Sequence, residues 1–395
     1  MFEELGGKLA AAVAKATDTA KQTAVGVLNK AAELAKQGAG AVADGMQKVL
    51  DNDLASAAAL QGVSMIPVVG PGAAVGGAVK AGYDYALKGD KKYTSADPYL
   101  DGELKDAAIV HCGSDVKKEK VRRRKEREGL IAQCKASADP AKQQAAERLE
   151  RDMVGVERAR LSKHVYDQYD PTKQPPPAPP TGYLIPSEGE LAKLGVEPRD
   201  LAPKDFSFRA QIYKVDPEVG PIPPQYITAF RGTSVREDWT QVNIPHGLGR
   251  ETKSYNAAMN LAQTMAKSGA STEFTGHSMG GGLASAAAVV TGIKATTQNS
   301  SGLHKNTTVR FDQTKPLDRE AARKFVDAYR IDGADKAEIL SSLNKIPGVP
   351  DAIGQPHKLE APKEGVSRLA LHDIDAVIDS IEERKTADQQ TLRPR

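Results

Sequence analysis

The chain has 395 residues, of which 40% are hydrophobic and 27% are charged. This length allows two or three domains of ordinary size, and the composition is typical of a globular protein rather than a disordered or membrane-spanning one. The formal net charge of +3 indicates no particular partner, and nucleic acid is not implied. The only two cysteines, Cys112 and Cys134, are too few for a disulfide scaffold and lack neighbours at metal-ligand spacing. The sequence is compatible with a disulfide bond between these two cysteines and with two free thiols.

The first residues, Met1-Phe2-Glu3-Glu4-Leu5, are acidic where a secretory signal would be basic, and no compact apolar core follows them. We therefore expect no cleaved Sec-type leader. The protein would stay in the cytoplasm or leave through a machine that cleaves no leader.

Residues 1–100 are expected to be mainly helical, since apolar residues recur there at intervals of three and four. Residues 54–79 carry no charge and are long enough to cross a bilayer. Two prolines and many Gly and Ala residues would break such a helix, however, which favours a hairpin packed in the protein or covered by a partner. Membrane insertion of this segment is the alternative.

Residues 101–174 are predicted to form a charged helical region, because acidic and basic residues mix on a helical pattern around 117–127. A docking surface for acidic phospholipid headgroups is the alternative. The run Pro175-Pro176-Pro177-Ala178-Pro179-Pro180 cannot join a helix. We therefore expect a Pro-rich linker over 175–205, or else a ligand for a proline-recognition domain.

After this linker, short β-type runs alternate with helical ones, which predicts an α/β domain over 206–385 and a flexible tail over 386–395. We expect strands at 206–215, 225–230, 272–275 and 326–331. We expect helices at 254–267 and 280–290.

The pentapeptide Gly276-His277-Ser278-Met279-Gly280 lies between one of these strands and an Ala-rich helix. A nucleophilic serine on a sharp strand-to-helix turn needs glycines beside it, because larger side chains would collide with neighbouring backbone. The following helix aims its N-terminal dipole at the serine. Ser278 is therefore the predicted nucleophile.

A serine hydroxyl needs a histidine to accept its proton and a carboxylate to orient that histidine, and α/β-hydrolases place them in the order Ser, Asp, His. His277 belongs to the turn, and His304 comes before the strand that should carry the acid. We favour His372, at the start of a terminal helix, over His357.

The acid is expected in the loop after strand 326–331, where such sheets place functional groups. Asp335 is our first choice and Asp332 the second, with Glu338 left open. For the oxyanion, the residue after the nucleophile, Met279, offers one backbone N–H. Thr233, in the loop after strand 225–230, could supply both an N–H and a hydroxyl.

These motifs resemble the class 3 lipase family, the fungal-lipase-like α/β-hydrolases, over roughly 206–383. The run Ala229-Phe230-Arg231-Gly232-Thr233, followed by Asp238-Trp239 and Asn243, resembles the family's oxyanion strand, and the Ser278 motif resembles its nucleophile elbow, which usually has Leu at the Met279 position. The resemblance implies Ser278 as nucleophile, Thr233 and Met279 as oxyanion positions and His372 as base. The acid aligns in more than one way.

The N-terminal half lies outside that family. Together with the lipase domain and the run Asn299-Ser300-Ser301-Gly302-Leu303-His304, it resembles bacterial antibacterial lipase effectors of the type VI secretion system. This implies a phospholipid substrate, a cognate immunity protein and a secretion-apparatus spike or chaperone as partners. The protein would be cytoplasmic in the producer, leave without a cleaved signal and act at the envelope or periplasm of a target cell.

The predicted function is thus that of a serine lipase or phospholipase working through an acyl-enzyme. Two alternatives are an esterase of soluble substrates and a membrane-disrupting or pore-forming protein that acts through residues 54–79. The chemistry requires no metal or organic cofactor, and a calcium dependence stays open.

Overall fold

The computed structural model describes residues 99–393, except 221–223, 236–237, 248, 334–336, 339, 342–349, 363–365, 367 and 369. The expected helices of residues 1–98 and the apolar segment 54–79 lie outside this range. Within the described residues, no helix is both long and apolar enough to cross a membrane.

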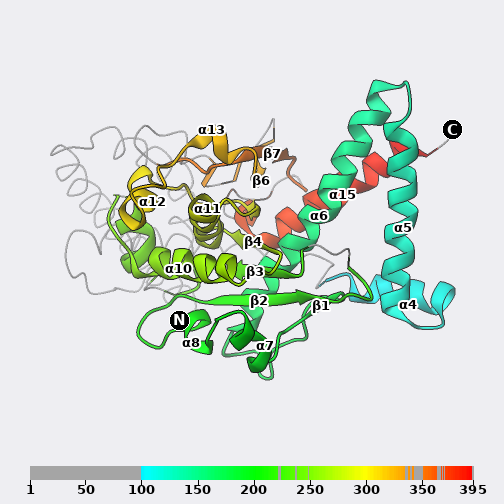
Figure 1. Ribbon diagram of the computed structural model, residues 1–395. Coiled ribbons are helices and arrows are strands. Elements are labelled where there is room, and N and C mark those ends of the chain that lie inside the picture. The colour runs from blue at the N-terminus through cyan, green and yellow to red at the C-terminus, as the bar shows by residue number, and fades with distance from the viewer. Residues whose placement is uncertain are drawn as a thin grey trace, which may run out of the picture.

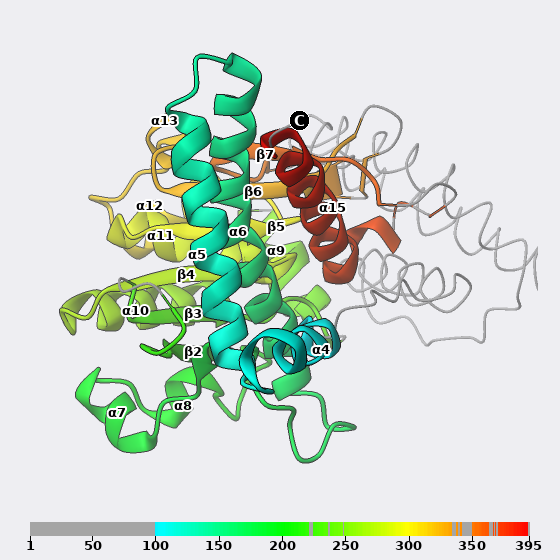
Figure 2. The same ribbon diagram turned by 90° about the vertical axis from the view of Figure 1, so that its right-hand side faces the viewer.

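In the part of the chain that the structure describes, seven strands form a single sheet. They are β1 (Tyr183–Leu184), β2 (Ala210–Val215), β3 (Tyr226–Phe230), β4 (Thr272–His277), β5 (Ala295–Gln298), β6 (Val326–Ile331) and β7 (Gln355–Leu359). The strands follow one another across the sheet in chain order, as Figure 2 shows for most of them. The pairs β1–β2 and β2–β3 are antiparallel, and β3 to β7 run parallel. The carboxyl ends of the parallel strands therefore meet at one edge.

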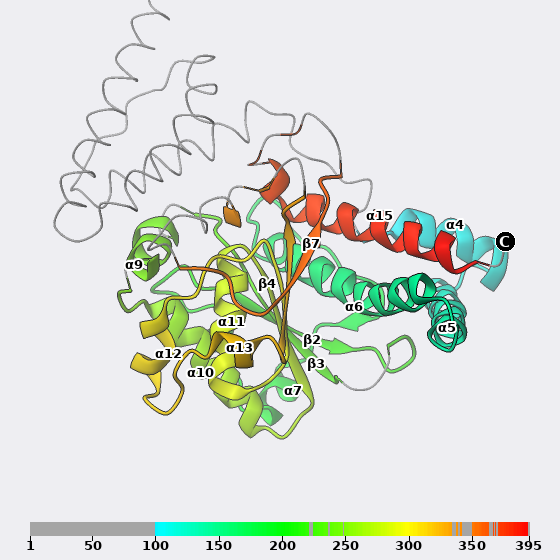
Figure 3. The same ribbon diagram turned by 90° about the horizontal axis from the view of Figure 1, so that it is seen from above.

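Helices cover both faces of the sheet (Figure 3). One face carries α10 (Lys253–Lys267), α11 (Met279–Thr291), α12 (Lys305–Phe311) and α13 (Arg319–Ala322). The other carries α6 (Pro140–Gln168) and α15 (Ile374–Leu392), with α4 (Asp101–Cys112) and α5 (Val116–Lys135) outside them (Figure 1). Short elements complete the chain: α7 (Glu188–Lys193), α8 (Pro198–Leu201), the π-helix η1 (Asp238–Asn243), α9 (Ile244–Gly247) and the 3-10 turn η2 (Ala370–His372).

The largest core lies between the sheet and the α10–α11 layer. Phe208 contacts Phe230, which in turn contacts Phe274, with tilted rings whose centroids lie 6.1 Å apart in each pair. Helix α11 buries eleven of its thirteen residues. Because most of these are Gly and Ala, the helix can approach the strands closely, as the Ala-rich sequence predicts.

The region before the polyproline run forms the helices α4, α5 and α6, and the last of these packs on the sheet. Helix α6 packs directly on the sheet, where Ser162 contacts Thr275 and Arg158 contacts Glu273. A Cβ at Gly155 would lie 2.4 Å from the Tyr329 ring, so α6 approaches β6 very closely. The proline run thus connects two parts of one packed unit.

The expected flexible tail is also largely helical. Helix α15 continues to Leu392, which is buried at 2% exposure, and Asp388 forms a hydrogen-bonded ion pair with Arg148 of α6. These contacts hold the end of the helix on α6. Cys112 and Cys134 are both free thiols.

Candidate active site

Ser278 lies at the turn from β4 into α11. Its φ of 58° and ψ of −125° are unusual for a residue with a side chain. The flanking glycines make this turn possible, because a Cβ at Gly276 would lie 2.1 Å from the backbone oxygen of Gly280. A Cβ at Gly280 would lie equally close to the backbone oxygen of Phe230. The local geometry is that of a nucleophile elbow.

The hydroxyl of Ser278 meets His372 and Glu338 in a continuous hydrogen-bonded chain. His372 Nε2 lies 2.9 Å from Ser278 Oγ, and His372 Nδ1 lies 2.8 Å from a carboxylate oxygen of Glu338. The imidazole and the carboxylate are buried, whereas Ser278 is partly exposed. Such an arrangement can remove a proton from a serine hydroxyl and stabilise the imidazolium that forms.

Glu338 is held as an acceptor from two sides. Its carboxylate accepts the backbone N–H of Leu340 at 2.8 Å and that of Ser341. Its own N–H donates to the carbonyl of Ile331 at the end of β6, at 2.9 Å. These backbone contacts fix the carboxylate where it faces His372 Nδ1.

The three acid candidates differ in where they lie. Asp335, our first choice from the sequence, lies outside the described residues. Asp332 lies 3.2 Å from Lys358 and 3.8 Å from Arg330, which engages it with the sheet. The carboxylate that contacts His372 belongs to Glu338, the candidate that the sequence leaves open.

The backbone carbonyl of His372 is fixed by two donors. Asn299 Nδ2 donates to it at 3.2 Å and to the carbonyl of Leu371 at 3.0 Å. The Oδ1 atom of the same side chain accepts the Ile331 N–H at 3.0 Å. Asn299 therefore joins the segment that carries His372 to the end of β6, which precedes Glu338.

His277 supplies the second donor. Its Nε2 lies 2.7 Å from the His372 carbonyl, and since a carbonyl only accepts, this nitrogen carries the proton. The hydroxyl of Tyr166 on α6 lies 3.0 Å from His277 Nδ1, which is then the acceptor. Burial and the neighbouring His372 imidazole lower the pKa of His277 to about 3, so it stays neutral.

The two remaining histidine candidates lie elsewhere. His357, on β7, contacts Asp327 at 2.6 Å, and His304 caps the N-terminus of α12. Neither has a hydrogen bond to Ser278 among the described contacts. Among these histidines, His372 is the one whose ring contacts Ser278 Oγ.

Two segments approach the position where a substrate oxyanion would form. The N–H of Met279 opens helix α11, where the first amides have no partner within the helix. The loop at Thr233 lies against the elbow, since a Cβ at Gly232 would lie 2.6 Å from the carbonyl oxygen of His277. Asn243 donates to Thr233 Oγ1 at 2.8 Å, which orients that hydroxyl.

The loop that carries Thr233 is organised by a buried carboxylate. One oxygen of Asp238 accepts the N–H groups of Ser234 at 2.7 Å and Val235 at 3.1 Å. Arg231 lies 4.0 Å from the same oxygen. Within the described part of the chain, no group of His, Cys, Asp or Glu residues could hold a metal ion.

Comparison with known proteins identifies the family. A family model described as a Tle-like phospholipase domain matches residues 157–373, which include Ser278, Glu338 and His372. The chain is also 32% identical over 214 residues to the extracellular phospholipase A1 of Serratia liquefaciens. That alignment covers 50% of this chain and 63% of the relative, so the chain spans less than two thirds of the relative's length. Because the family match covers more than half of the chain, the protein belongs to the Tle-like phospholipase family.

Proposed function

We propose that this protein hydrolyses an acyl ester bond of membrane phospholipids through an acyl-enzyme on Ser278. The observation that carries the proposal is the position of the His372 imidazole between Ser278 Oγ, at 2.9 Å, and Glu338, at 2.8 Å. Family membership supports a phospholipid as the substrate. The motif resemblance to class 3 lipases supports the same serine chemistry.

In the first half-reaction, Ser278 Oγ attacks the ester carbonyl carbon while its proton moves to His372 Nε2. Glu338 accepts a hydrogen bond from Nδ1–H, which fixes the tautomer that leaves Nε2 free to act as a base. The oxyanion is stabilised by the Met279 N–H and by Thr233. His372 then returns its proton to the departing lysophospholipid oxygen as the C–O bond breaks.

The second half-reaction repeats these steps with water. A water molecule gives its proton to His372 Nε2 and attacks the acyl carbon. The imidazolium then protonates Ser278 Oγ as the free fatty acid leaves. The products are one fatty acid and one lysophospholipid, and the protein returns to its starting state.

We assign the ester at position one of glycerophospholipids as the scissile bond. The support is the Serratia liquefaciens relative, which is described as a phospholipase A1. A phospholipid with different acyl chains at positions one and two tests this directly. Mass spectrometry should show release of the position-one chain, and it should show none with Ser278→Ala. Release of the position-two chain would overturn the regiochemical assignment alone.

Catalysis and membrane disruption are separable by the same variant. If the protein acts by hydrolysis, Ser278→Ala abolishes both lipid cleavage and leakage of phospholipid vesicles. Leakage that survives in Ser278→Ala would favour action through residues 54–79. For a lipase, the hydrolysis rate is expected to rise once the substrate concentration exceeds the critical micelle concentration. A rate that has already reached its maximum below that concentration would favour an esterase of soluble substrates.

For the biological role, we propose an antibacterial effector exported by the type VI secretion system. Supporting it are the resemblance of residues 299–304 and the extracellular location named for the relative. The expected partners are a secretion spike or chaperone and a cognate immunity protein. Directing the protein to the periplasm of a susceptible bacterium should stop growth. Growth that continues equally with the native protein and Ser278→Ala would contradict the role.

A further inference from the structure

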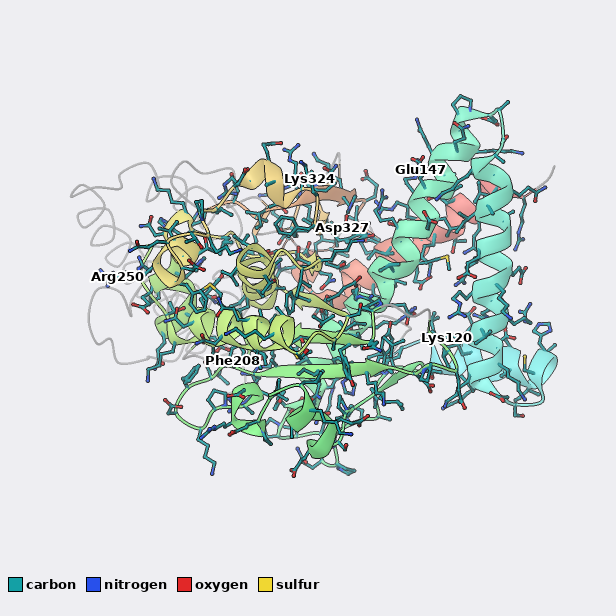
Figure 4. The ribbon with its side chains drawn as sticks, in the orientation of Figure 1. Lys120, Glu147, Phe208, Arg250, Lys324 and Asp327 are labelled. Atoms are coloured by element: carbon teal, nitrogen blue, oxygen red, sulfur yellow. The ribbon has the colours of Figure 1, made fainter. Side chains whose placement is uncertain are left out.

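A second cavity lies away from the catalytic serine, where α4, α5 and α6 meet the β1–β2 side of the sheet. Its volume is about 400 Å³, and none of Ser278, Glu338 and His372 lines it. Figure 4 shows Lys120 on the part of α5 that faces this side, where it donates to the Thr181 carbonyl at 2.6 Å. The volume falls within the range of small-molecule sites.

The cavity lining contains both apolar and cationic side chains. The apolar side chains include Leu104, Ile131, Met153, Val215 and Val219. The lining also carries a cluster of cations from three helices that are distant in sequence. These cations are Lys120, Arg123 and Arg127 of α5, Arg160 of α6 and Lys385 of α15.

These five cations outnumber the carboxylates that pair with them. Glu157 pairs with Lys120 and Arg160, both at distances under 3 Å. Glu382 pairs with Arg160 at 2.6 Å and Lys385 at 2.9 Å.

A third carboxylate, Glu119, takes Arg123 at 2.8 Å. The other acids of the lining, Glu128 and Glu150, have their own cations in Arg124 and Lys135. Arg123 also pairs with Glu103 at 3.3 Å, so the five clustered cations face four carboxylates. One of these four, Glu119, is shared with Arg122, which lies outside the cavity lining. Positive charge therefore remains beside the cavity.

Arg127 is the cation of this cluster for which no carboxylate partner is seen among the described residues. It is partly buried and lines the cavity, yet within the described residues it makes neither a hydrogen bond nor an ion pair. Burial lowers the pKa of Arg127, and the positive charges of Arg123 and Arg160 lower it further. The negative charges of Glu382 and Glu157 act in the opposite direction. A guanidinium in this setting gains from an oxyanion that accepts its free donors.

We propose that this cavity binds an amphiphile with one anionic head and one acyl chain. Its phosphate or carboxylate head would lie against Arg127, between Arg123 and Arg160. Its chain would contact the apolar side chains of the lining, Met153 among them. The proposal stands independently of the proposed phospholipase function, because it uses none of the residues of that site.

Methionine methyl NMR can report the two sites separately. The chain has seven methionines, of which Met153 lines the cavity and Met279 follows Ser278. With methyl-13C methionine labelling, dodecyl phosphate below its critical micelle concentration should shift the Met153 signal saturably. The Met153 signal is assigned with Met153→Leu. A response confined to Met279 would overturn the proposal.

Head and chain should both matter. Inorganic phosphate, which lacks the chain, and dodecyl maltoside, which lacks the charge, should each bind at least ~10-fold more weakly than dodecyl phosphate. Equal binding of inorganic phosphate would indicate a plain anion site, and equal binding of the maltoside a plain apolar one. Either result contradicts an anionic amphiphile site.

Variants locate the binding. Arg127→Gln should weaken dodecyl phosphate binding by about 10-fold, because it removes a charged donor while keeping most of the side-chain length. Lys125→Gln, an exposed residue of the same helix outside the cavity lining, is the matched control and should bind as the native chain does. Ala132→Phe should block the cavity without a charge change. Equal affinities in Arg127→Gln and Lys125→Gln would refute the site.

Discussion

The two faces of the sheet are built from opposite chemistry. On one face, α11 presents small apolar residues from Met279 to Val290 and no charged side chain. On the other, α6 and α15 bury ions such as Arg158, Arg160, Asp152 and Lys385, each matched to a partner. The first face depends on close backbone approach, and the second on directed polar contacts.

The candidate active site forms where these two layers meet the carboxyl edge of the sheet. The first layer provides Ser278, on a turn that only glycine neighbours permit. The second provides His372, in the 3-10 turn η2 just before α15, and Tyr166, which reaches His277 from α6. A larger side chain at a glycine beside Ser278 should therefore disrupt the turn that carries this serine. Loss of a polar contact to His372 should instead change the position of its imidazole.

Glu338→Gln should have the largest effect among the supporting residues. A glutamine keeps the size but no longer matches the charge that forms on His372, so kcat should fall by about 10³ to 10⁴-fold. The measurement is the steady-state rate on a phospholipid ester. Asp332→Asn and Asp335→Asn are the matched controls and should retain most activity. Loss in Asp335→Asn with near-native Glu338→Gln would move the acid back to Asp335.

Gly280→Ala tests the close backbone approach of α11 to the strands. Its new Cβ would meet the Phe230 backbone, which cannot move cheaply, so we expect a loss of about 3 kcal/mol in the free energy of unfolding or failure to fold. Gly129→Ala, in α5 of the charged layer, has nothing within 4 Å of its new Cβ. There we expect a gain of about 0.5 to 1 kcal/mol. Equal destabilisation of the two variants would break the contrast between the layers.

His277→Gln tests the neutral buried imidazole through pH. The pKa of His277 lies at about 3 in the fold, whereas an unfolded histidine titrates near 6.5. The unfolded state therefore binds more protons below pH 6.5, and this group costs stability as pH falls towards 3. Between pH 6.5 and 4.5 the native protein should lose about 2 kcal/mol more than His277→Gln.

Denaturant unfolding of both proteins across that range gives the comparison. His246, whose pKa burial also lowers to about 3, is present in both proteins and cancels. Parallel pH profiles for the native chain and His277→Gln would show that His277 is not the neutral buried group described above.

Tyr166→Phe should have the smallest effect. It removes the hydroxyl that contacts His277 Nδ1 and leaves the packing of the ring, so kcat should fall by about 3- to 10-fold at unchanged KM. Tyr169→Phe removes a hydroxyl that donates to the Ala210 carbonyl at 2.8 Å and should leave kcat unchanged. An equal loss in both variants would mean a general loss of packing rather than positioning of the base.

The sequence predicts most of this fold where the signal is local. The strand-turn-helix around Ser278 is encoded by adjacent residues, and the observed β4 and α11 lie within a few residues of the predicted ones. The short β5 and β7 were not predicted, because four or five residues carry little periodicity. Helix α6 was predicted only as part of a charged helical region, although its small buried residues Gly155 and Ala159 indicate close packing on another layer.

The acid shows where local signals end. Asp332, Asp335 and Glu338 lie within seven residues after one strand, so chain order cannot choose between them. The choice depends on how the chain turns back from β6 until Glu338 faces His372. One signal was present: Glu338 precedes the N–H groups of a helical turn at Leu340 and Ser341, which a carboxylate can cap.

The most direct test of the proposed catalytic centre is covalent labelling with a fluorophosphonate, which reacts with an activated serine hydroxyl. Intact-protein mass spectrometry should show one adduct per native chain, and peptide mapping should place it on Ser278. Ser278→Ala should take up none, and Glu338→Gln should label far more slowly. An adduct on another residue, or lipid hydrolysis by a native chain that takes up no label, would contradict the account.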